Sequence, residues 1–348
     1  MSVPFIATPT PNTPPYSTYY STYYSITTMA TINPKRTVLV TGATSGIGLE
    51  AARHLAKEGH TVIVASRDQG RVEACCAGLR EDTKSTAIHA LTLNLASLAS
   101  VKEAADQLLN NHSDWAFDTL VLNAGLHGMN FEKSAEGLEI TFATNHLGHY
   151  YLARLLTPRL LENAKAHQVR ARVIIVSSGT HDPANHTPVT PPIYNLENWR
   201  LPAAGEFNAP RAYTQSKLAN ALFGNDLAAQ FDPQELTVAI FDPGFISETG
   251  LSRDLGGVGQ AVVGVLGRLY LRTVHAIYGS TLQIGSMSRS PAFLARLAVD
   301  SSLVEETGHY YCIDAIDKCS VVASDRAKQV ELREFSDAIL KELGHSFS

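Results

Sequence analysis

Short apolar runs alternate with segments of helical spacing from Thr37 to Gly244, and this alternation restricts the fold more than any other feature. The runs interpreted as buried strands are 37–42, 61–66, 87–94, 119–125, 172–178 and 236–244. The helical segments are 47–59, 72–81, 99–111, 138–164 and 212–223. Such alternation predicts an α/β fold in which a single doubly wound parallel sheet has helices on both faces. The nearly continuous apolar runs agree, because parallel strands are buried on both faces.

Two regions interrupt the alternation within the expected domain of residues 37–348. Residues 181–211 are rich in Pro, Asn and Thr and are predicted to be a surface insertion. Residues 248–290 include an apolar, Gly-broken stretch, which we interpret as a helical cover over a substrate pocket because it follows the carboxyl end of a strand. An ordinary core helix is the alternative. A helix on a membrane surface is less favoured, since its polar face would carry only Arg268 and Arg272.

The first 36 residues differ from the rest in composition. They contain no acidic residue and many Pro, Ser and Thr, so residues 1–36 are predicted to be a disordered extension. A plastid or mitochondrial targeting segment is the alternative, although no arginine precedes Arg36. The expected location is cytoplasmic. The cysteines are expected to be free thiols in a reducing compartment, and they are Cys75, Cys76, Cys312 and Cys319.

The overall composition excludes several classes of function. The net charge of −5, from 28 basic and 33 acidic residues, gives no indication of a nucleic-acid partner. No run of 18 apolar residues occurs, so no membrane-spanning helix is expected. His146 and His149 are three residues apart without a third ligand, so no metal site is expected.

The turn after the first strand has the sequence TGATSGIG, with glycines spaced as GxxxGxG. Glycine permits a tight turn and lets backbone N–H groups approach a pyrophosphate. The next helix would point its positive N-terminus at the same anion. A P-loop is excluded because no GK[ST] follows. The dinucleotide contacts predicted in this turn are Gly42, Thr44, Ser45, Gly46, Ile47 and Gly48.

The end of the second strand indicates which dinucleotide binds. A site for NAD would place Asp or Glu there to hold the ribose 2′-hydroxyl. The chain instead has Ser66 followed by Arg67. A guanidinium can hold a 2′-phosphate, so the sequence predicts NADP(H) with Ser66 and Arg67 as contacts.

Tyr213 and Lys217 are four apart in a helical segment, so their side chains share one face. A free tyrosine, with a pKa of about 10, is a poor acid/base group at neutral pH. The lysine ammonium and the positive charge of an oxidised nicotinamide are both expected to lower that pKa.

The chain resembles the short-chain dehydrogenase/reductases over residues 37–249. The similar motifs are, in order, TGATSGIG at Thr41, LNLAS at Leu93, LNAG at Leu122, TNHLGHYYLARLL at Thr144, IVSSG at Ile175, YTQSK at Tyr213 and DPGFISET at Asp242. NHLGH and YTQSKLAN are similar to the branch of retinol dehydrogenases, WW-domain oxidoreductases and light-dependent protochlorophyllide reductases.

The resemblance implies catalytic roles for four residues. Asn145 corresponds to an asparagine that kinks its helix and anchors a water for proton relay, and Ser178 to a serine that polarises the carbonyl. Tyr213 corresponds to the general acid/base, and Lys217 to the lysine that lowers the tyrosine pKa and holds the ribose. The further cofactor contacts that the resemblance implies are Asn94, Leu95, Asn123, Ala124, Gly125, Pro243, Gly244, Ile246 and Thr249.

Three positions depart from the pattern of the family. Asn94 replaces the usual Asp, although its amide oxygen can still accept from an adenine amino group. Glu248 stands where a threonine usually helps to bind phosphate, and Thr249 follows one residue late. Phe245 stands where protochlorophyllide reductases carry a cysteine, which argues against chlorophyll precursors. Phe245 and His181 are the candidate substrate contacts.

The sequence thus predicts an NADP(H)-dependent oxidoreductase that reduces a ketone or aldehyde of a hydrophobic small molecule, or oxidises the corresponding alcohol. Reduction of an activated C=C bond is one alternative. A dinucleotide-sensing regulator without turnover is another, although such a protein would be expected to lose Tyr213 or Lys217. A monomer is favoured over a homodimer, because residues 181–211 precede the Tyr213 helix and are placed to cover its pairing face.

Overall fold

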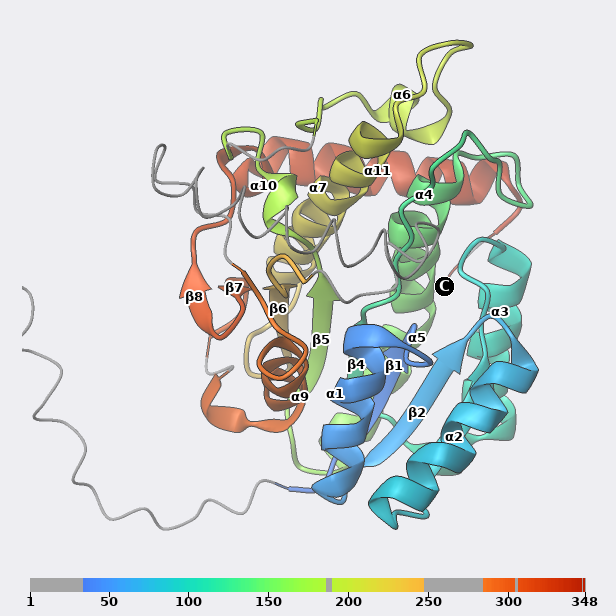
Figure 1. Cartoon of the computed structure of the whole chain (residues 1–348), viewed down its shortest axis with the longest axis vertical. Coiled ribbons are helices and arrows are strands. Elements are labelled where there is room, and N and C mark those ends of the chain that lie inside the picture. Colours follow the sequence, from blue (N-terminus) through green and yellow to red (C-terminus); the bar gives the residue numbers. More distant parts are fainter. Residues whose placement is uncertain (1–33, 186–189, 247–283, 304–305, 346, 348) are drawn as a thin grey trace, which may run out of the picture. The chain divides into compact units, whose positions relative to one another are not determined.

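Eight strands form one sheet in the part of the chain that the computed structural model describes, which is residues 34–185, 190–246, 284–303, 306–345 and 347. The strand order is β3-β2-β1-β4-β5-β6-β7-β8 (Figure 1). Strands β1 to β7 pair in parallel, and β8 is antiparallel to β7. The strands are β1 Thr37–Thr41, β2 Thr61–Ser66, β3 Ile88–Thr92, β4 Thr119–Leu122, β5 Ala171–Val176, β6 Leu236–Asp242, β7 His309–Cys312 and β8 Ala315–Asp317.

Helices cover both faces of this sheet (Figure 1). Val38 and Val40 of β1 belong to one buried apolar core and Leu39 to the other, because successive strand residues point to opposite faces. The helices of the Val38 core are α1 Gly46–Lys57, α2 Gln69–Thr83 and α9 Ser290–Val299. Those of the Leu39 core are α3 Leu98–Asp106, α5 Gly148–Ala166, α7 Ala209–Ala228 and α11 Arg326–Glu342. The predicted doubly wound α/β fold is confirmed.

All six predicted strands are present, whereas β7 and β8 lie beyond the predicted alternation. β7 extends the sheet past β6 by pairing Tyr310 with Ile240 and Cys312 with Asp242. It has only four residues, so its apolar run is too short to stand out in the sequence.

The predicted extension and the predicted substrate cover fall mostly outside the described residues, which exclude 1–33 and 247–283. Arg36, which the sequence places in the extension, is buried in the domain. Phe245 and Ile284, which lie on either side of the undescribed residues in the sequence, form an isolated parallel bridge.

The predicted insertion 181–211 is described apart from residues 186–189. It contains α6 (Leu196–Arg200). The carbonyl of Ile193 accepts from Gln215 Nε2 of α7 at 3.0 Å, and Tyr194 Oη donates to Glu331 Oε2 of α11 at 2.8 Å. The insertion is therefore fastened to both helices.

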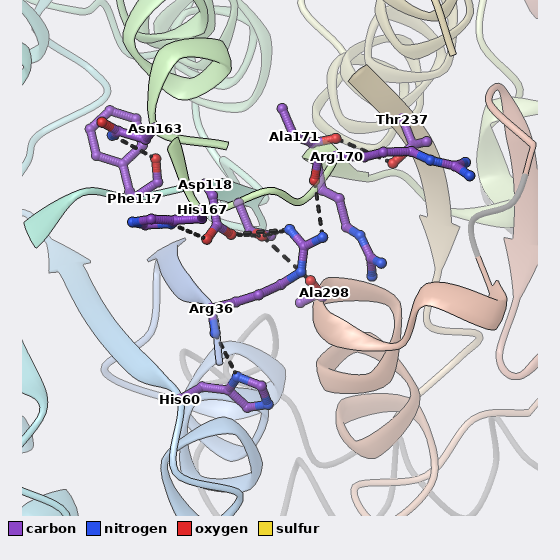
Figure 2. A network of polar contacts seen from close by, with 12 residues as sticks. Arg36, His60, Phe117, Asp118, Asn163, His167, Arg170, Ala171, Thr237 and Ala298 are labelled. Atoms are coloured by element: carbon purple, nitrogen blue, oxygen red, sulfur yellow. Dashed lines mark hydrogen bonds and ion pairs between the residues drawn. The ribbon is translucent and has the colours of Figure 1, made fainter. Parts of the chain in front are cut away.

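A buried ion pair lies at the edge of the sheet where the parallel strands begin (Figure 2). Arg36 Nη1, before β1, donates to Asp118 Oδ1, before β4, at 3.0 Å, and both side chains are buried. Arg36 Nη2 donates to the carbonyl of Arg170, before β5, and Asp118 Oδ2 lies 3.1 Å from His167 Nδ1. The pair thus joins the starts of three neighbouring strands.

Asp118→Ala is expected to lower the free energy of unfolding by about 3–5 kcal/mol, because it leaves the buried Arg36 guanidinium without its counter-charge. His167→Ala removes the more exposed partner of the same carboxylate and is expected to cost less than about 1 kcal/mol. Urea denaturation measures both. Equal losses of unfolding free energy in the two variants would show that the buried ion pair contributes no more than the contact with His167.

Candidate active site

The glycine turn lies at the carboxyl edge of the sheet, between β1 and α1. Gly42 and Gly46 have φ angles of +67° and +58°, which favour glycine. A Cβ on Gly42 would lie 2.7 Å from Ala124 Cα, and one on Gly48 would lie 2.5 Å from Asn123 Nδ2. The turn can therefore pack closely on the loop after β4 only with glycine at positions 42 and 48.

The start of α1 faces open space, because a Cβ on Gly46 would meet no atom within 4 Å. The N-cap residue Ser45 makes no side-chain capping bond, and the first turn of α1 holds no acidic residue. The first N–H groups of the helix and the positive end of its dipole are therefore directed at this space. This fits an anionic phosphate, as predicted for the turn that contains Thr44, Ser45 and Ile47.

The end of β2 lies beside this turn, since Thr44 Oγ1 is 3.2 Å from Ser66 Oγ. Arg67 is exposed, and none of its contacts within the described residues is an ion pair. The neighbouring carboxylate of Asp68 accepts from Arg71 N at 2.8 Å and caps α2. The guanidinium is thus placed to meet a ligand, while the acidic side chain caps the helix.

The loop after β4 is bound to the last residue of β1. Thr41 Oγ1 accepts from the backbone N–H groups of Asn123 at 2.9 Å and Ala124 at 3.0 Å. Asn123 Nδ2 donates in turn to the carbonyl of Thr41 at 2.8 Å. Two of the predicted cofactor contacts are therefore held directly against the glycine turn.

Asn94 and Leu95 follow β3. Asn94 Oδ1 already accepts from Ala96 N at 3.1 Å, so the predicted adenine contact would use the second lone pair of this oxygen. Leu95 is buried, and a Cβ on Gly148 would lie 2.3 Å from its carbonyl oxygen. Leu95 is thus in tight contact with the start of α5.

Asn145 lies in a π-helical turn, Ala143–Leu147, that separates the short helix α4 (Ile140–Phe142) from α5. The single helix predicted over 138–164 is interrupted there. Asn145 Oδ1 accepts from Leu126 N at 2.8 Å, and Asn145 Nδ2 donates to Leu126 O and Ser216 Oγ, both at 2.9 Å. The side chain therefore joins the loop after β4 to α7.

His149 is a residue that the sequence analysis considered only as a metal ligand. It is buried, its Nδ1 donates to the Asn145 carbonyl at 3.0 Å, and its Nε2 accepts from Thr41 Oγ1 at 2.8 Å. Burial lowers the pKa of His149 to about 4, so the ring is neutral with its proton on Nδ1. The sequence could have indicated this contact, because His149 lies four residues after Asn145 and therefore on the same helix face.

Ser178, Tyr213 and Lys217 come together beyond the end of β5. Lys217 Nζ donates to the carbonyl of Val176 at 3.2 Å and lies 5.6 Å from the centroid of the Tyr213 ring. The side chain of Ser178 lies close enough to Tyr213 to lower the pKa of the phenol. A Cβ on Gly125 would lie 3.4 Å from Lys217 Nζ and 3.6 Å from the Asn145 side-chain oxygen, so the fourth predicted residue adjoins the other three.

Burial is the largest of the effects that the protein has on the pKa of Tyr213. Burial and the charge of Asp242 raise this pKa to about 12, against the opposing hydrogen bond from Ser178. Burial lowers the pKa of Lys217 to about 8, while Asp242 acts in the opposite direction. The predicted lowering of the tyrosine pKa by Lys217 and an oxidised nicotinamide would act against the effect of burial on the phenol, and it stays a prediction. Spacing along a helix does not show how strongly burial disfavours a phenolate.

His181, a predicted substrate contact, is buried next to the site. Its Nδ1 donates to the Ser178 carbonyl at 2.8 Å, and its Nε2 accepts from Ser320 N at 3.1 Å. A substrate contact through either nitrogen would have to displace one of these bonds. The ring thus fixes the backbone of Ser178.

The loop after β6 holds the remaining predicted contacts. Gly244 has a φ of +73°, and its N–H donates to Asp242 Oδ1 at 2.8 Å. The carbonyl of Pro243 accepts from Ser290 Oγ at 2.7 Å, and Ile246 is buried. Phe245 is half-buried in its bridge to Ile284. Thr249 and Glu248 lie outside the described residues.

The described residues bring together no group of three His, Cys, Asp or Glu side chains that could hold a metal ion. No helix among them is both long and apolar enough to cross a membrane.

Comparison with known proteins identifies the relatives of the chain. Residues 36–189 match the family model described as short chain dehydrogenase. Human retinol dehydrogenase 13 is 32% identical over 80% of this chain and 76% of that protein. Human WW domain-containing oxidoreductase is 35% identical over 63% of this chain, and the match spans 50% of the relative's length. The chloroplastic short-chain dehydrogenase TIC 32 A of Brassica napus is 29% identical over 88% of this chain and 89% of that protein. The predicted family resemblance is confirmed.

Solved structures share the fold. An uncharacterised protein of Mycobacterium paratuberculosis has a TM-score of 0.60 and 27% identity, covering 91% of this chain and 97% of that chain. L-Sorbose reductase of Gluconobacter frateurii, solved with NADPH and L-sorbose, has a TM-score of 0.58 and 20% identity. The match covers 81% of this chain and 96% of that chain. At 20% identity the likeness shows the fold alone.

His149→Phe is expected to lower the free energy of unfolding by about 1–3 kcal/mol, because it leaves the Thr41 hydroxyl and the Asn145 carbonyl buried without their partner. His149→Gln can both donate and accept and is expected to retain most of this stability. Urea denaturation of Thr41→Val, His149→Phe and the double variant tests the link. Fully additive losses would show that the two side chains do not act together.

Proposed function

The chain belongs to the short-chain dehydrogenase family, and on this basis we propose that it catalyses NADP(H)-dependent reduction of a ketone or aldehyde, or the reverse oxidation of an alcohol. The observation that carries the proposal is the meeting of Ser178, Tyr213 and Lys217 at the carboxyl edge of the sheet, beside the glycine turn. In doubly wound sheets this edge is where ligands bind.

The residues of this edge fit a nicotinamide dinucleotide phosphate. The open start of α1 would hold the pyrophosphate, and the exposed Arg67 would hold the 2′-phosphate. Lys217 would hold the ribose, and the loop of Gly244 and Ile246 would contact the carboxamide. The bound cofactor supplies the hydride in reduction and accepts it in oxidation.

The side chains of the protein donate the proton that the reduction needs and take it up again afterwards. During reduction, negative charge develops on the carbonyl oxygen, where Ser178 donates a hydrogen bond and Tyr213 delivers its phenolic proton. With a pKa of about 12, Tyr213 carries this proton at neutral pH and is ready to donate it. The ammonium of Lys217 then stabilises the phenolate until a proton from solvent restores the phenol.

Apolar side chains beside the catalytic tyrosine support a hydrophobic substrate. The ring of His127 lies 5.2 Å from that of Tyr213, edge to face. In the same loop Met129 and Phe131 are exposed, and Phe131 lies 5.5 Å from Phe207 of the insertion. Burying these groups against an apolar molecule would favour binding.

A monomer is supported by the position of α11 (Figure 1). Buried Leu332 and Ile339 pack it into the core of α5 and α7, and His146 Nε2 on the α5 side lies 3.1 Å from Ser336 Oγ. The helices of Asn145 and Tyr213, through which family members often pair, thus already have a partner. Light scattering measures the oligomeric state directly.

The expected location remains cytoplasmic, and the likeness to a chloroplastic relative supports the alternative that residues 1–36 direct the chain to a plastid. Microscopy of residues 1–36 fused to a fluorescent protein distinguishes the two.

Tyr213→Phe is expected to lower kcat/KM for carbonyl reduction by about 10²- to 10⁴-fold, because the proton donor is lost. NADPH binding, followed by nicotinamide fluorescence, should persist. Tyr194→Phe removes a phenol of the insertion and serves as the matched control, with expected wild-type activity. Full activity of Tyr213→Phe on a substrate that the wild type reduces well would refute the mechanism.

Arg67→Ala is expected to weaken NADPH binding by about ten- to a hundredfold, since a charge-assisted hydrogen bond contributes roughly 1.5–3 kcal/mol. NADH binding should change little. Lys84→Ala removes a charge from the other end of α2 and controls for net charge. Titration of each variant with both cofactors measures the selectivity, and an equal loss for NADH would rule out a 2′-phosphate contact.

A further inference from the structure

Asp242, the last residue of β6, carries a buried carboxylate whose partners are all neutral. Its Oδ1 accepts from Gly244 N at 2.8 Å. Its Oδ2 accepts from Tyr310 Oη at 3.1 Å and from Cys312 Sγ at 3.5 Å, both on β7. Among the described residues no cation lies within ion-pair distance of Asp242. A buried charge so placed is costly unless another charge compensates it.

Lys217 of α7 is a buried cation in the matching situation, next to the neighbouring strand β5. It is buried, and its Nζ donates to the Val176 carbonyl with no carboxylate at ion-pair distance in the described part of the chain. Val176 of β5 is in register with Phe241 of β6, and Asp242 is the next residue. The Asp242 carboxylate and the carbonyl that accepts from Lys217 Nζ therefore lie at the ends of two adjacent strands.

The other titratable groups nearby do not compensate either charge at neutral pH. Burial lowers the pKa of His181, His149 and His127, and burial raises the pKa of Tyr310 and Cys312. The groups that face Asp242, Lys217 or Tyr213 in the described residues are Tyr310 and Cys312 of β7, Cys319 before α10 (Val321–Ser324), His181 after β5, His149 of α5 and His127 after β4.

We propose that Asp242 is the counter-charge of the catalytic pair, a positioning residue that keeps Lys217 charged and Tyr213 protonated and so favours proton donation in carbonyl reduction. This inference rests on the proposed function for the direction of the reaction, but the electrostatic link does not depend on turnover. The negative charge of Asp242 raises the pKa of both Lys217 and Tyr213. Replacing Asp242 by a neutral side chain therefore lowers both values.

The first test is NADPH binding to the full chain between pH 6 and pH 10, followed by nicotinamide fluorescence. Wild-type affinity is expected to fall as Lys217 loses its proton, near pH 8. In Asp242→Asn the fall is expected about one pH unit lower or more. Asp242→Ser removes the same charge and replaces Asp242→Asn if that variant does not fold.

The second test is the pH dependence of kcat/KM in both directions. Reduction needs the phenol and oxidation needs the phenolate. The alkaline loss of reduction and the alkaline gain of oxidation should therefore both move to lower pH by the same amount in Asp242→Asn.

Two variants keep the negative charge at position 242 and so separate the effect of this charge from the effect of packing. Asp242→Glu retains the carboxylate, and Tyr310→Phe removes one hydrogen bond to it, so both should keep the wild-type pH profile even where the rate falls. A shift in Tyr310→Phe equal to that in Asp242→Asn would show that packing, not charge, is responsible, and would overturn the inference.

The outcomes distinguish this inference from the proposed function. If the wild type binds NADPH but turns over no carbonyl or alcohol, the proposed function fails, while an acid shift of binding in Asp242→Asn still supports the charge link. If the wild type is active and a folded Asp242→Asn keeps the wild-type profile in binding and in turnover, the inference is wrong and the function stands.

Discussion

The hydroxyl of Thr41 holds together the segments from which the site is built. It accepts from the N–H groups of Asn123 and Ala124 and donates to His149, which in turn donates to the carbonyl of Asn145. A hydroxyl suits this place because it can accept two hydrogen bonds while it donates one. The glycine turn, the loop after β4 and the interrupted helix that carries Asn145 are thereby fixed to one strand end.

The charges of the site lie where water cannot screen them. Burial makes each interaction between Asp242, Lys217 and Tyr213 stronger than it would be at the surface. The same burial also makes each charge costly in free energy. The net free energy of the charges therefore depends on which partners lie close to them. A positive cofactor ring would act with Lys217 on the phenol, whereas Asp242 acts against them.

Local features of the sequence predicted the fold and indicated which residues make up the candidate site. The strands, the glycine turn and the pair Tyr213 and Lys217 are set by neighbours in sequence, so spacing alone located them. The partners of His149 and Asp242 are distant: Thr41 is 108 residues from His149, and Tyr310 is 68 from Asp242. Periodicity also indicates that a helix such as α11 has an apolar face, but not which helices this face covers. The burial that raises the pKa of Tyr213 could not be predicted for a related reason, because burial results from the whole fold.

The bridge between Phe245 and Ile284 has an evolutionary consequence. A segment whose two ends are held side by side can be lengthened, shortened or exchanged without moving any strand, and the entropy of closing it grows only slowly with its length. The candidate catalytic residues Ser178, Tyr213 and Lys217 lie outside the part of the chain between Phe245 and Ile284. A change of length or sequence between these two residues would therefore leave the three candidate residues in place.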